Sequence, residues 1–476
     1  MRRVVQALTL FAMLSIVGHP VTYRELAAQD RLDGRWHGAI LVLGSELGIV
    51  VGFETTDTGL SATIDIEQQG AMGIPLTAVS FDPPKVHFEL PAGPGLAVFD
   101  GELTGDSIGG PFTQAGVAGT FWLKRGEPKP EAPAEPVPYL EEEVQFANGD
   151  VTLAGTLTLP EGGGPHPAVV MITGSGPQNR DEELFGFKPF RIIADHLTRN
   201  GLAVLRYDDR GVGGSTGNTM AATSSDFADD ALAAVRLLVE RTEIDSEAIG
   251  LVGHSEGALV AAIAASRSPD LAFIVMLAGT AVSGEEILYA QSALIMRANG
   301  ATDEEVSDNA ALQRQIFEAV RTDEGWEAVR QGVEVQIRRS IDDLPAERRQ
   351  EITDVDSLVA SRVEQQLVAV RSPWFRSFLD YNPATDLEHV RVPVLAVFGE
   401  NDLQVPPAVN RVPMEQALQK AGNADYTITV IPGANHLFLA SETGNPSEYA
   451  TQEKVFVPEL LETVTTWLTE RWGGQR

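Results

Sequence analysis

The sequence predicts an α/β fold for its larger, C-terminal part, with a small all-β domain before it. Three observations lead there. Apolar runs alternate with helical stretches after about residue 140, as in a mostly parallel sheet with helices on both faces. Before that point, short runs alternate apolar and polar residues between turn-forming clusters, as in half-buried strands. A proline-rich segment separates the two patterns.

The N-terminal pattern predicts a small sandwich or barrel over residues 29–125. Alternating runs occupy 61–68, 85–90, 96–103 and 119–125, and clusters such as AGPG and TGDS lie between them. The segment that follows, 126–139, contains GEPKPEAPAEPVP, whose dense prolines and charges cannot form a core. We interpret it as a semi-rigid linker.

The C-terminal pattern predicts a single α/β domain over residues 140–476. Asn148 and Gly149 supply a hairpin turn between two alternating runs. Strands are expected at 167–173, 202–208, 248–255, 273–279, 392–399 and 426–433. Residues from about 284 to 386 have helical patterns without a core strand. We expect this insertion to form a helical cap over the carboxyl edge of the sheet.

Composition narrows the classes of function. The 476 residues include 67 acidic and 35 basic side chains, for a formal net charge of −32, so the surface repels phosphate backbones and nucleic acid is not an expected partner. The chain has no cysteine, which excludes disulfides, thiolate chemistry and cysteine-ligated zinc.

Residues 1–28 have the pattern of a signal peptide. Arg2 and Arg3 precede an apolar stretch at 4–17 that is too short for a membrane anchor, and Ala27-Ala28 is the expected cleavage site. The alternative is a buried N-terminal helix. We expect an exported protein, periplasmic or secreted, with no stable membrane anchor.

A lone serine between two glycines is a candidate catalytic residue. GHSEG, at 253–257, has the G-x-S-x-G pattern of a nucleophile elbow, although the two glycines could simply allow close packing. The pattern follows a predicted strand and opens a predicted helix rich in small residues, which favours the elbow. Ser255 is then the candidate nucleophile, and the backbone N–H of Glu256 is a candidate oxyanion donor.

A serine nucleophile needs a base and a group that orients the base. Of eight histidines, only His436 follows the last predicted strand at its carboxyl end, and His254 is expected to point elsewhere on the turn. Asp402, just beyond the preceding strand, is the candidate acid that would fix the tautomer of His436. Glu400 is its nearest rival.

Two glycine-rich loops complete the candidate site. TGSGPQNRDE follows the strand at 167–173, and the N–H of Ser175 is the second candidate oxyanion donor. DDRGVGGSTG, at 208–217, lacks the G-K-S/T ending of a phosphate loop. We expect it to border the site as a rigid loop, with Asp209 and Arg210 paired to each other.

The motifs and their order resemble those of the α/β-hydrolase superfamily over about residues 144–472. The motifs that carry the resemblance are ITGSGPQNRDE, YDDRGVGGST, GHSEGA and VFGENDLQVPP…PGANHLF. More narrowly, the chain is similar to exported carboxylesterases with a β-rich N-terminal domain, near the serine aminopeptidase-like group. The resemblance implies an α/β-hydrolase fold, roles for Ser255, Asp402 and His436 as nucleophile, acid and base, and short-chain, small-molecule esters as substrates. It implies neither a cofactor nor a metal. Ala258 stands where many relatives have a second glycine.

Two other functions fit the same motifs. A serine exopeptidase or prolyl-type peptidase would need a group that anchors a free amine, for which the acidic cap residues could serve. A binding protein with an inert hydrolase domain is disfavoured by the complete set of three residues. Several apolar cap positions are candidates to line an acyl pocket or simply to form the core of the cap: Leu288, Ile295, Trp374, Phe375 and Phe378.

Overall fold

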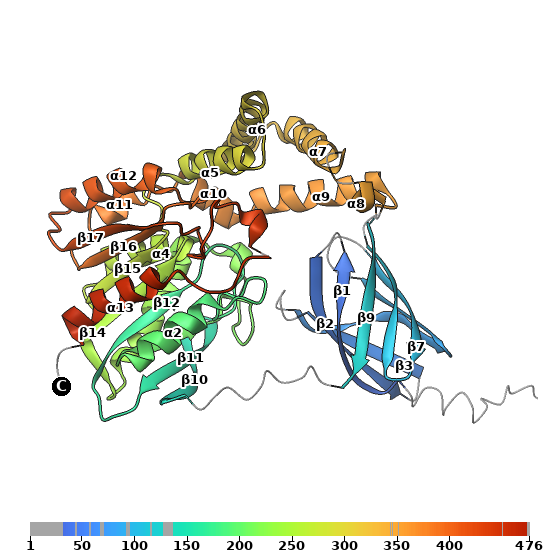
Figure 1. Cartoon of the computed structure of the whole chain (residues 1–476), viewed down its shortest axis with the longest axis horizontal. Coiled ribbons are helices and arrows are strands. Elements are labelled where there is room, and N and C mark those ends of the chain that lie inside the picture. The colour runs from blue at the N-terminus through green and yellow to red at the C-terminus, as the bar shows by residue number, and fades with distance from the viewer. Residues whose placement is uncertain are drawn as a thin grey trace, which may run out of the picture.

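The computed structural model describes residues 32–473, apart from 43–44, 57–58, 67–70, 92–95, 115–116, 127–136, 343, 345, 351 and 450. The proposed signal peptide and most of the proposed linker lie outside these residues. The chain forms an N-terminal β part and a C-terminal α/β part, with a set of inserted helices between them (Figure 1). Among the described residues, no helix has the length and apolar character needed to cross a membrane.

The N-terminal part is, in the described residues, one antiparallel sheet in the order β4-β3-β2-β1-β9-β8-β7-β6-β5. Its strands are β1 (Gly34–Val42), β2 (Ser45–Thr56), β3 (Gly59–Ile66), β4 (Ala71–Pro75), β5 (Thr77–Asp82), β6 (Lys85–Pro91), β7 (Leu96–Thr104), β8 (Ser107–Gln114) and β9 (Val117–Arg125). The sheet curls around an aromatic core, in which Phe88 stacks on Phe99 and Phe121 meets both rings edge-on (Figure 1). One side of each strand faces this core, which accounts for the alternation in the sequence.

The C-terminal part is built on a sheet in the order β10-β11-β13-β12-β14-β15-β16-β17. Its strands are β10 (Tyr139–Asn148), β11 (Val151–Pro160), β12 (His166–Ile172), β13 (Ala203–Tyr207), β14 (Ile244–His254), β15 (Phe273–Leu277), β16 (Val394–Gly399) and β17 (Tyr426–Ile431). The β10–β11 and β11–β13 pairs are antiparallel, and all pairs from β13 to β17 are parallel. The carboxyl ends of six strands therefore meet at one edge, where the candidate residues follow.

Helices cover both faces of this sheet. One face packs against α2 (Pro189–Arg199) and α13 (Pro458–Trp472), and the other against α3 (Ser224–Val239), α4 (Glu256–Arg267) and α12 (Pro407–Lys420). β12 shows the division, since Val169 and Met171 join the first core while Val170 and Ile172 join the second. A strand buried on both faces must be apolar throughout, as its sequence is.

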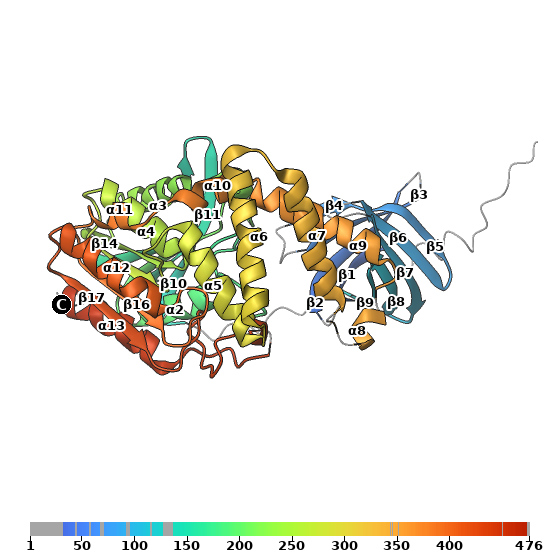
Figure 2. The ribbon, with the colours of Figure 1, turned by 90° about the horizontal axis from the view of Figure 1, so that it is seen from above.

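The insertion lies between β15 and β16. Its helices are α5 (Gly284–Ala298), α6 (Asp303–Thr322), α7 (Trp326–Asp342), α8 (Ala346–Gln350), α9 (Val355–Val370), α10 (Pro373–Asp380) and α11 (Ala384–Leu387). They share a core that includes Phe317, Val333 and Leu367. Val117 of β9 joins this core and pairs with Ile352, where α8 and α9 reach the N-terminal sheet (Figures 1 and 2).

Two glycines allow α4 to begin unusually close to the sheet. A Cβ atom added to Gly253 would lie 2.0 Å from the carbonyl oxygen of Gly257. A Cβ added to Gly257 would lie 2.0 Å from the carbonyl oxygen of Ile172. Both neighbours are backbone atoms, which cannot rotate away, so the turn between β14 and α4 requires glycine at both positions.

We therefore expect Gly257→Ala to destabilise the C-terminal part by about 2–3 kcal/mol through overpacking against the end of β12. Thermal melting followed by circular dichroism measures the effect. Gly163→Ala is the matched control, because open space surrounds Gly163 in the loop before β12. An unchanged melting temperature in Gly257→Ala would show that the turn is not packed as described.

Candidate active site

Ser255 occupies a strained turn between β14 and α4. Its backbone has φ 54° and ψ −115°, a conformation that is rare for residues other than glycine. The Ser255 N–H donates a 2.8 Å hydrogen bond to the Leu277 carbonyl at the end of β15, which fixes the turn to the neighbouring strand. The turn thus holds the residue at the carboxyl edge of the sheet, ahead of the first turn of α4.

Asp402 and His436 form a buried pair two and three strands away from β14. Nδ1 of His436 lies 2.8 Å from Oδ2 of Asp402, and the two residues are 5% and 2% exposed. The other oxygen of Asp402 accepts hydrogen bonds from the N–H groups of Gln404 and Val405, at 2.7 and 2.8 Å. The carboxylate is thereby fixed from both sides, and Nε2 of His436 is left for other partners.

The His436 ring lies beside the residue that precedes Ser255. The ring centroids of His254 and His436 are 4.8 Å apart, and Nε2 of His254 lies 3.0 Å from the His436 carbonyl oxygen. Within the described residues, Ser255 Oγ makes no hydrogen bond to His436. The structure therefore joins Asp402 to His436 directly and brings His436 to the turn that carries Ser255.

Glu400, the rival acid, lies outside this pair. It is exposed, and its Oε2 accepts a 2.9 Å hydrogen bond from the N–H of Gly433. The two carboxylates follow the same strand but contact different residues of the loop that carries His436.

The loop after β12 places Ser175 next to the turn. A Cβ built on Gly174 would lie 3.4 Å from Cβ of Ser255, so the loop passes directly beside the serine. The N–H of Gly174 donates to Oε1 of Glu182 at 2.7 Å. That amide is engaged, and the next one belongs to Ser175, which is exposed.

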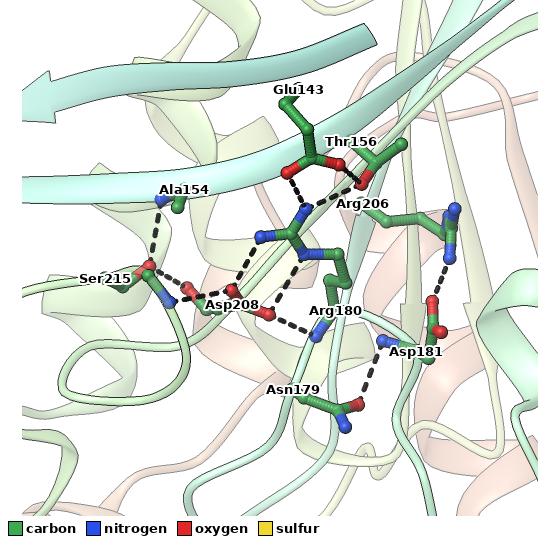
Figure 3. Close-up of polar contacts among 10 residues, drawn as sticks. Glu143, Ala154, Thr156, Asn179, Arg180, Asp181, Arg206, Asp208 and Ser215 are labelled. Carbon is green, nitrogen blue, oxygen red and sulfur yellow. Dashed lines mark hydrogen bonds and ion pairs between the residues drawn. The ribbon is translucent and has the colours of Figure 1, made fainter. Parts of the chain in front are cut away.

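An ion-pair network holds this loop in place (Figure 3). Arg180 donates to Oδ2 of the buried Asp208 at 2.8 Å and to Oε2 of Glu143 at 2.6 Å. Asp208 also accepts from the N–H of Gly214, which joins the two glycine-rich loops. The sequence motifs NRD and DDRG are thus two halves of one network.

The expected pairing of Asp209 with Arg210 is wrong. Arg210 binds Asp230 of α3 at 2.6 Å, while Asp209 accepts from Thr173 Oγ1 and from the N–H of Gln178. Partners on different elements hold the two side chains, so they do not meet. Burial raises the pKa of Asp209 well above its usual value, against the effect of these two hydrogen bonds.

The side chain of Glu256 connects the turn to the insertion. Its Oε1 accepts from Ser224 Oγ at 2.6 Å and from Trp374 Nε1 of α10 at 2.8 Å. Trp374 in turn stacks on Phe378, with ring centroids 5.3 Å apart. Of the other candidate pocket residues, Leu288 and Phe375 pack against the core of the insertion.

Two residues beside the site escaped the sequence reasoning. Glu182 and His254 form a buried pair, with Oε1 of Glu182 2.9 Å from Nδ1 of His254. The signal was available in the acidic end of NRDE and in the histidine of GHS, but nothing local relates them. In the described residues, no group of three or more His, Asp or Glu side chains is arranged to hold a metal ion.

Comparison with known proteins identifies the family. Residues 169–452, more than half of the chain, match the model of the alpha/beta hydrolase family. The chain belongs to that family. Esterase EstD of Thermotoga maritima is 25% identical over 358 residues, which cover 74% of this chain and 74% of that protein.

Solved alpha/beta hydrolase structures are also similar. Alpha/beta hydrolase GrgF from Penicillium sp. sh18 matches with 16% identity and a TM-score of 0.44, covering 70% of this chain and 99% of that one. The Pyrococcus furiosus esterase Pf2001 matches with 16% identity and a TM-score of 0.43, covering 72% and 97%. The five candidate residues of this alpha/beta hydrolase all follow strands of its sheet. Ser175 follows β12, Ser255 and Glu256 follow β14, Asp402 follows β16, and His436 follows β17.

The Glu256 carboxyl predicts a pH-dependent stability. Burial raises its pKa, against the hydrogen bonds from Ser224 and Trp374, and Oε2 is buried without a partner. A raised folded-state pKa gives stability that is complete below the unfolded pKa of about 4.3 and is lost as pH rises through the folded pKa. The melting temperature of the neutral isostere Glu256→Gln, relative to that of wild type, should therefore rise as the pH increases above about 4.3.

Glu240→Gln, at an exposed position after α3, is the matched control and should show no such trend. A difference between Glu256→Gln and wild type that stays constant with pH would contradict the assignment.

Proposed function

We propose that this protein is a serine hydrolase that cleaves short-chain carboxylic esters through an acyl-enzyme on Ser255. The observation that carries the proposal is the buried Asp402–His436 pair beside a strained turn that presents a serine at the start of a helix. Membership of the alpha/beta hydrolase family and the similarity to an esterase support ester hydrolysis.

In the first half of the proposed reaction, Ser255 Oγ attacks the ester carbonyl while Nε2 of His436 accepts the hydroxyl proton. Asp402 accepts the Nδ1–H of His436, which fixes the tautomer and stabilises the imidazolium. The hydrogen bond between nucleophile and base is commonly long in enzymes without substrate and shortens in the complex.

The tetrahedral intermediate carries an oxyanion, for which two backbone donors are at hand. The N–H groups of Glu256, at the start of α4, and of Ser175, in the adjoining loop, are our candidates, each worth about 3–4 kcal/mol in the transition state. His436 then gives its proton to the departing alkoxide, which leaves as the alcohol. Water attacks the acyl-enzyme by the same steps in reverse, releasing the acid and restoring Ser255.

The insertion supports a preference for small acyl groups. Trp374 reaches from α10 to the residue after Ser255, so the insertion lies against the site on that side. Each further methylene gains only about 0.8 kcal/mol on burial, while overpacking costs more. We propose esters with acyl chains of roughly two to eight carbons as substrates. We also propose that residues 1–28 direct the export of the protein.

A serine-directed fluorophosphonate tests the nucleophile. It should add once, at Ser255, and Ser255→Ala should lose the label and lower turnover of p-nitrophenyl butyrate by about 10⁶-fold. Ser107→Ala, exposed on β8, is the matched control and should keep both. Labelling that persists in Ser255→Ala refutes the assignment. Faster turnover of aminoacyl p-nitroanilides than of p-nitrophenyl esters would favour the peptidase alternative.

The choice of acid is tested by two isosteric variants. Asp402→Asn should lower turnover by about 10⁴-fold, because an asparagine stabilises the wrong tautomer of His436 and cannot stabilise its charged form. Glu400→Gln can still accept the hydrogen bond from Gly433, and it should change turnover little. Kinetics with p-nitrophenyl butyrate measure both losses, and the reverse ranking would make Glu400 the acid.

A further inference from the structure

Glu182 and His254 form a second buried histidine–carboxylate pair, distinct from the pair of Asp402 and His436. Glu182 is 5% and His254 is 7% exposed, and their side chains meet 72 residues apart in the chain. No step of the proposed reaction uses either side chain. A buried ionisable pair is costly to maintain unless further hydrogen bonds satisfy both groups.

Those contacts reach three parts of the site. Oε1 of Glu182 accepts the N–H of Gly174, one residue before the candidate oxyanion donor Ser175. His254 directly precedes Ser255, and its Nε2 meets the backbone carbonyl of His436 at 3.0 Å. The pair therefore joins the oxyanion loop, the nucleophile turn and the loop of the base in one chain of hydrogen bonds.

The hydrogen-bond partners define the protonation of His254. One ring nitrogen faces a carboxylate oxygen and the other faces a carbonyl oxygen, and both of these are acceptors. An imidazole is ordinarily a stronger base than a carboxylate, so the shared proton belongs to the ring. His254 is then an imidazolium that donates from both nitrogens, beside an ionised Glu182.

The electrostatic surroundings agree with this state. Burial lowers the pKa of His254, but the charge and hydrogen bond of Glu182, the His436 carbonyl and the charge of Asp402 raise it above its usual value. In the described part of the chain, the charged groups that act on His254 are Glu182 and Asp402, and the His436 ring is a further titratable neighbour. Glu182 also offsets the positive charge next to His436, which must itself become positive during attack.

We propose that Glu182 and His254 are positioning residues, a charged pair that holds the Ser175 loop and the His436 loop in register with Ser255. The inference rests on the proposed function. Neither residue touches the substrate; both act through the backbone of the groups that do. A displacement of about 1 Å at such groups can lower turnover by about 10²-fold.

Glu182→Gln separates charge from shape. The amide oxygen can still accept from Gly174 and from Nδ1 of His254, but it cannot compensate a charged ring. A neutral His254 with Nδ1–H has a bare Nε2, which cannot donate to the His436 carbonyl. The variant should therefore keep the tie to the oxyanion loop and lose the tie to the base.

The first test is kinetic, on the full chain with p-nitrophenyl butyrate. Glu182→Gln and His254→Gln should each lower kcat by about 10- to 100-fold while KM changes less than about threefold. The double variant should lose about as much as one single variant, because the two residues act as a unit. Glu142→Gln is the matched control: it neutralises a β10 carboxylate that is paired with Arg241 and lies four strands from β14 in the sheet, and it should leave kcat within about twofold. A folded Glu182→Gln with wild-type kcat overturns the proposal.

The second test is made on the wild type, and His254→Gln serves only to assign the signal. Just above the ordinary imidazole pKa of about 6.5, the ¹⁵N spectrum of histidine-labelled wild type should contain an imidazolium signal, with both nitrogens protonated, that is absent from the spectrum of His254→Gln. Without any such imidazolium signal, the proposal is refuted. Failure of the proposed function looks different: wild type would neither hydrolyse esters nor be labelled at Ser255, whatever the state of His254.

Discussion

The close approach of α4 to the carboxyl edge of the sheet is the constraint on which the rest of the site depends. The turn at Ser255 exists because backbone atoms of β12, β14 and α4 nearly touch, and only glycine fits at 253 and 257. Close packing and chemistry are therefore not alternatives here. The same approach that strains Ser255 also directs the first N–H groups of α4 toward the space in front of it.

Everything else in the site arrives on loops, and buried carboxylates hold those loops. Asp208 ties Arg180 to the loop after β13, Asp209 ties Thr173 to Gln178, and Asp402 fixes both His436 and its own turn. Each carboxylate accepts from backbone N–H groups or from charged donors, which is how buried charges are tolerated. This part of the chain's acidity is structural, whereas most of its negative charge lies on the surface.

Local sequence signals were enough for some features and not for others. Apolar runs mark β12, β15 and β16 because strands buried on both faces leave few polar positions, and chain order singles out His436 and Asp402. The pair of Glu182 and His254 depends on how two loops fold against each other, which no local pattern encodes. The curled N-terminal sheet is similar, since alternation indicates strands but not that β1 pairs with β9 across the whole domain.

The insertion shows the same limit at the level of a single helix. Trp374 and Phe375 are adjacent and equally apolar, yet Phe375 packs into the insertion while Trp374 reaches Glu256 beside the nucleophile turn. Which residue faces the site depends on the rotation of α10. Gly284 lets α5 start close to α10, because a Cβ added to Gly284 would lie 2.0 Å from the Phe378 carbonyl oxygen. At its other end the insertion shares its core with Val117 of the N-terminal sheet. One continuous set of apolar contacts therefore links the N-terminal sheet to α10, and the hydrogen bond from Trp374 to Glu256 carries that link to the residue after Ser255.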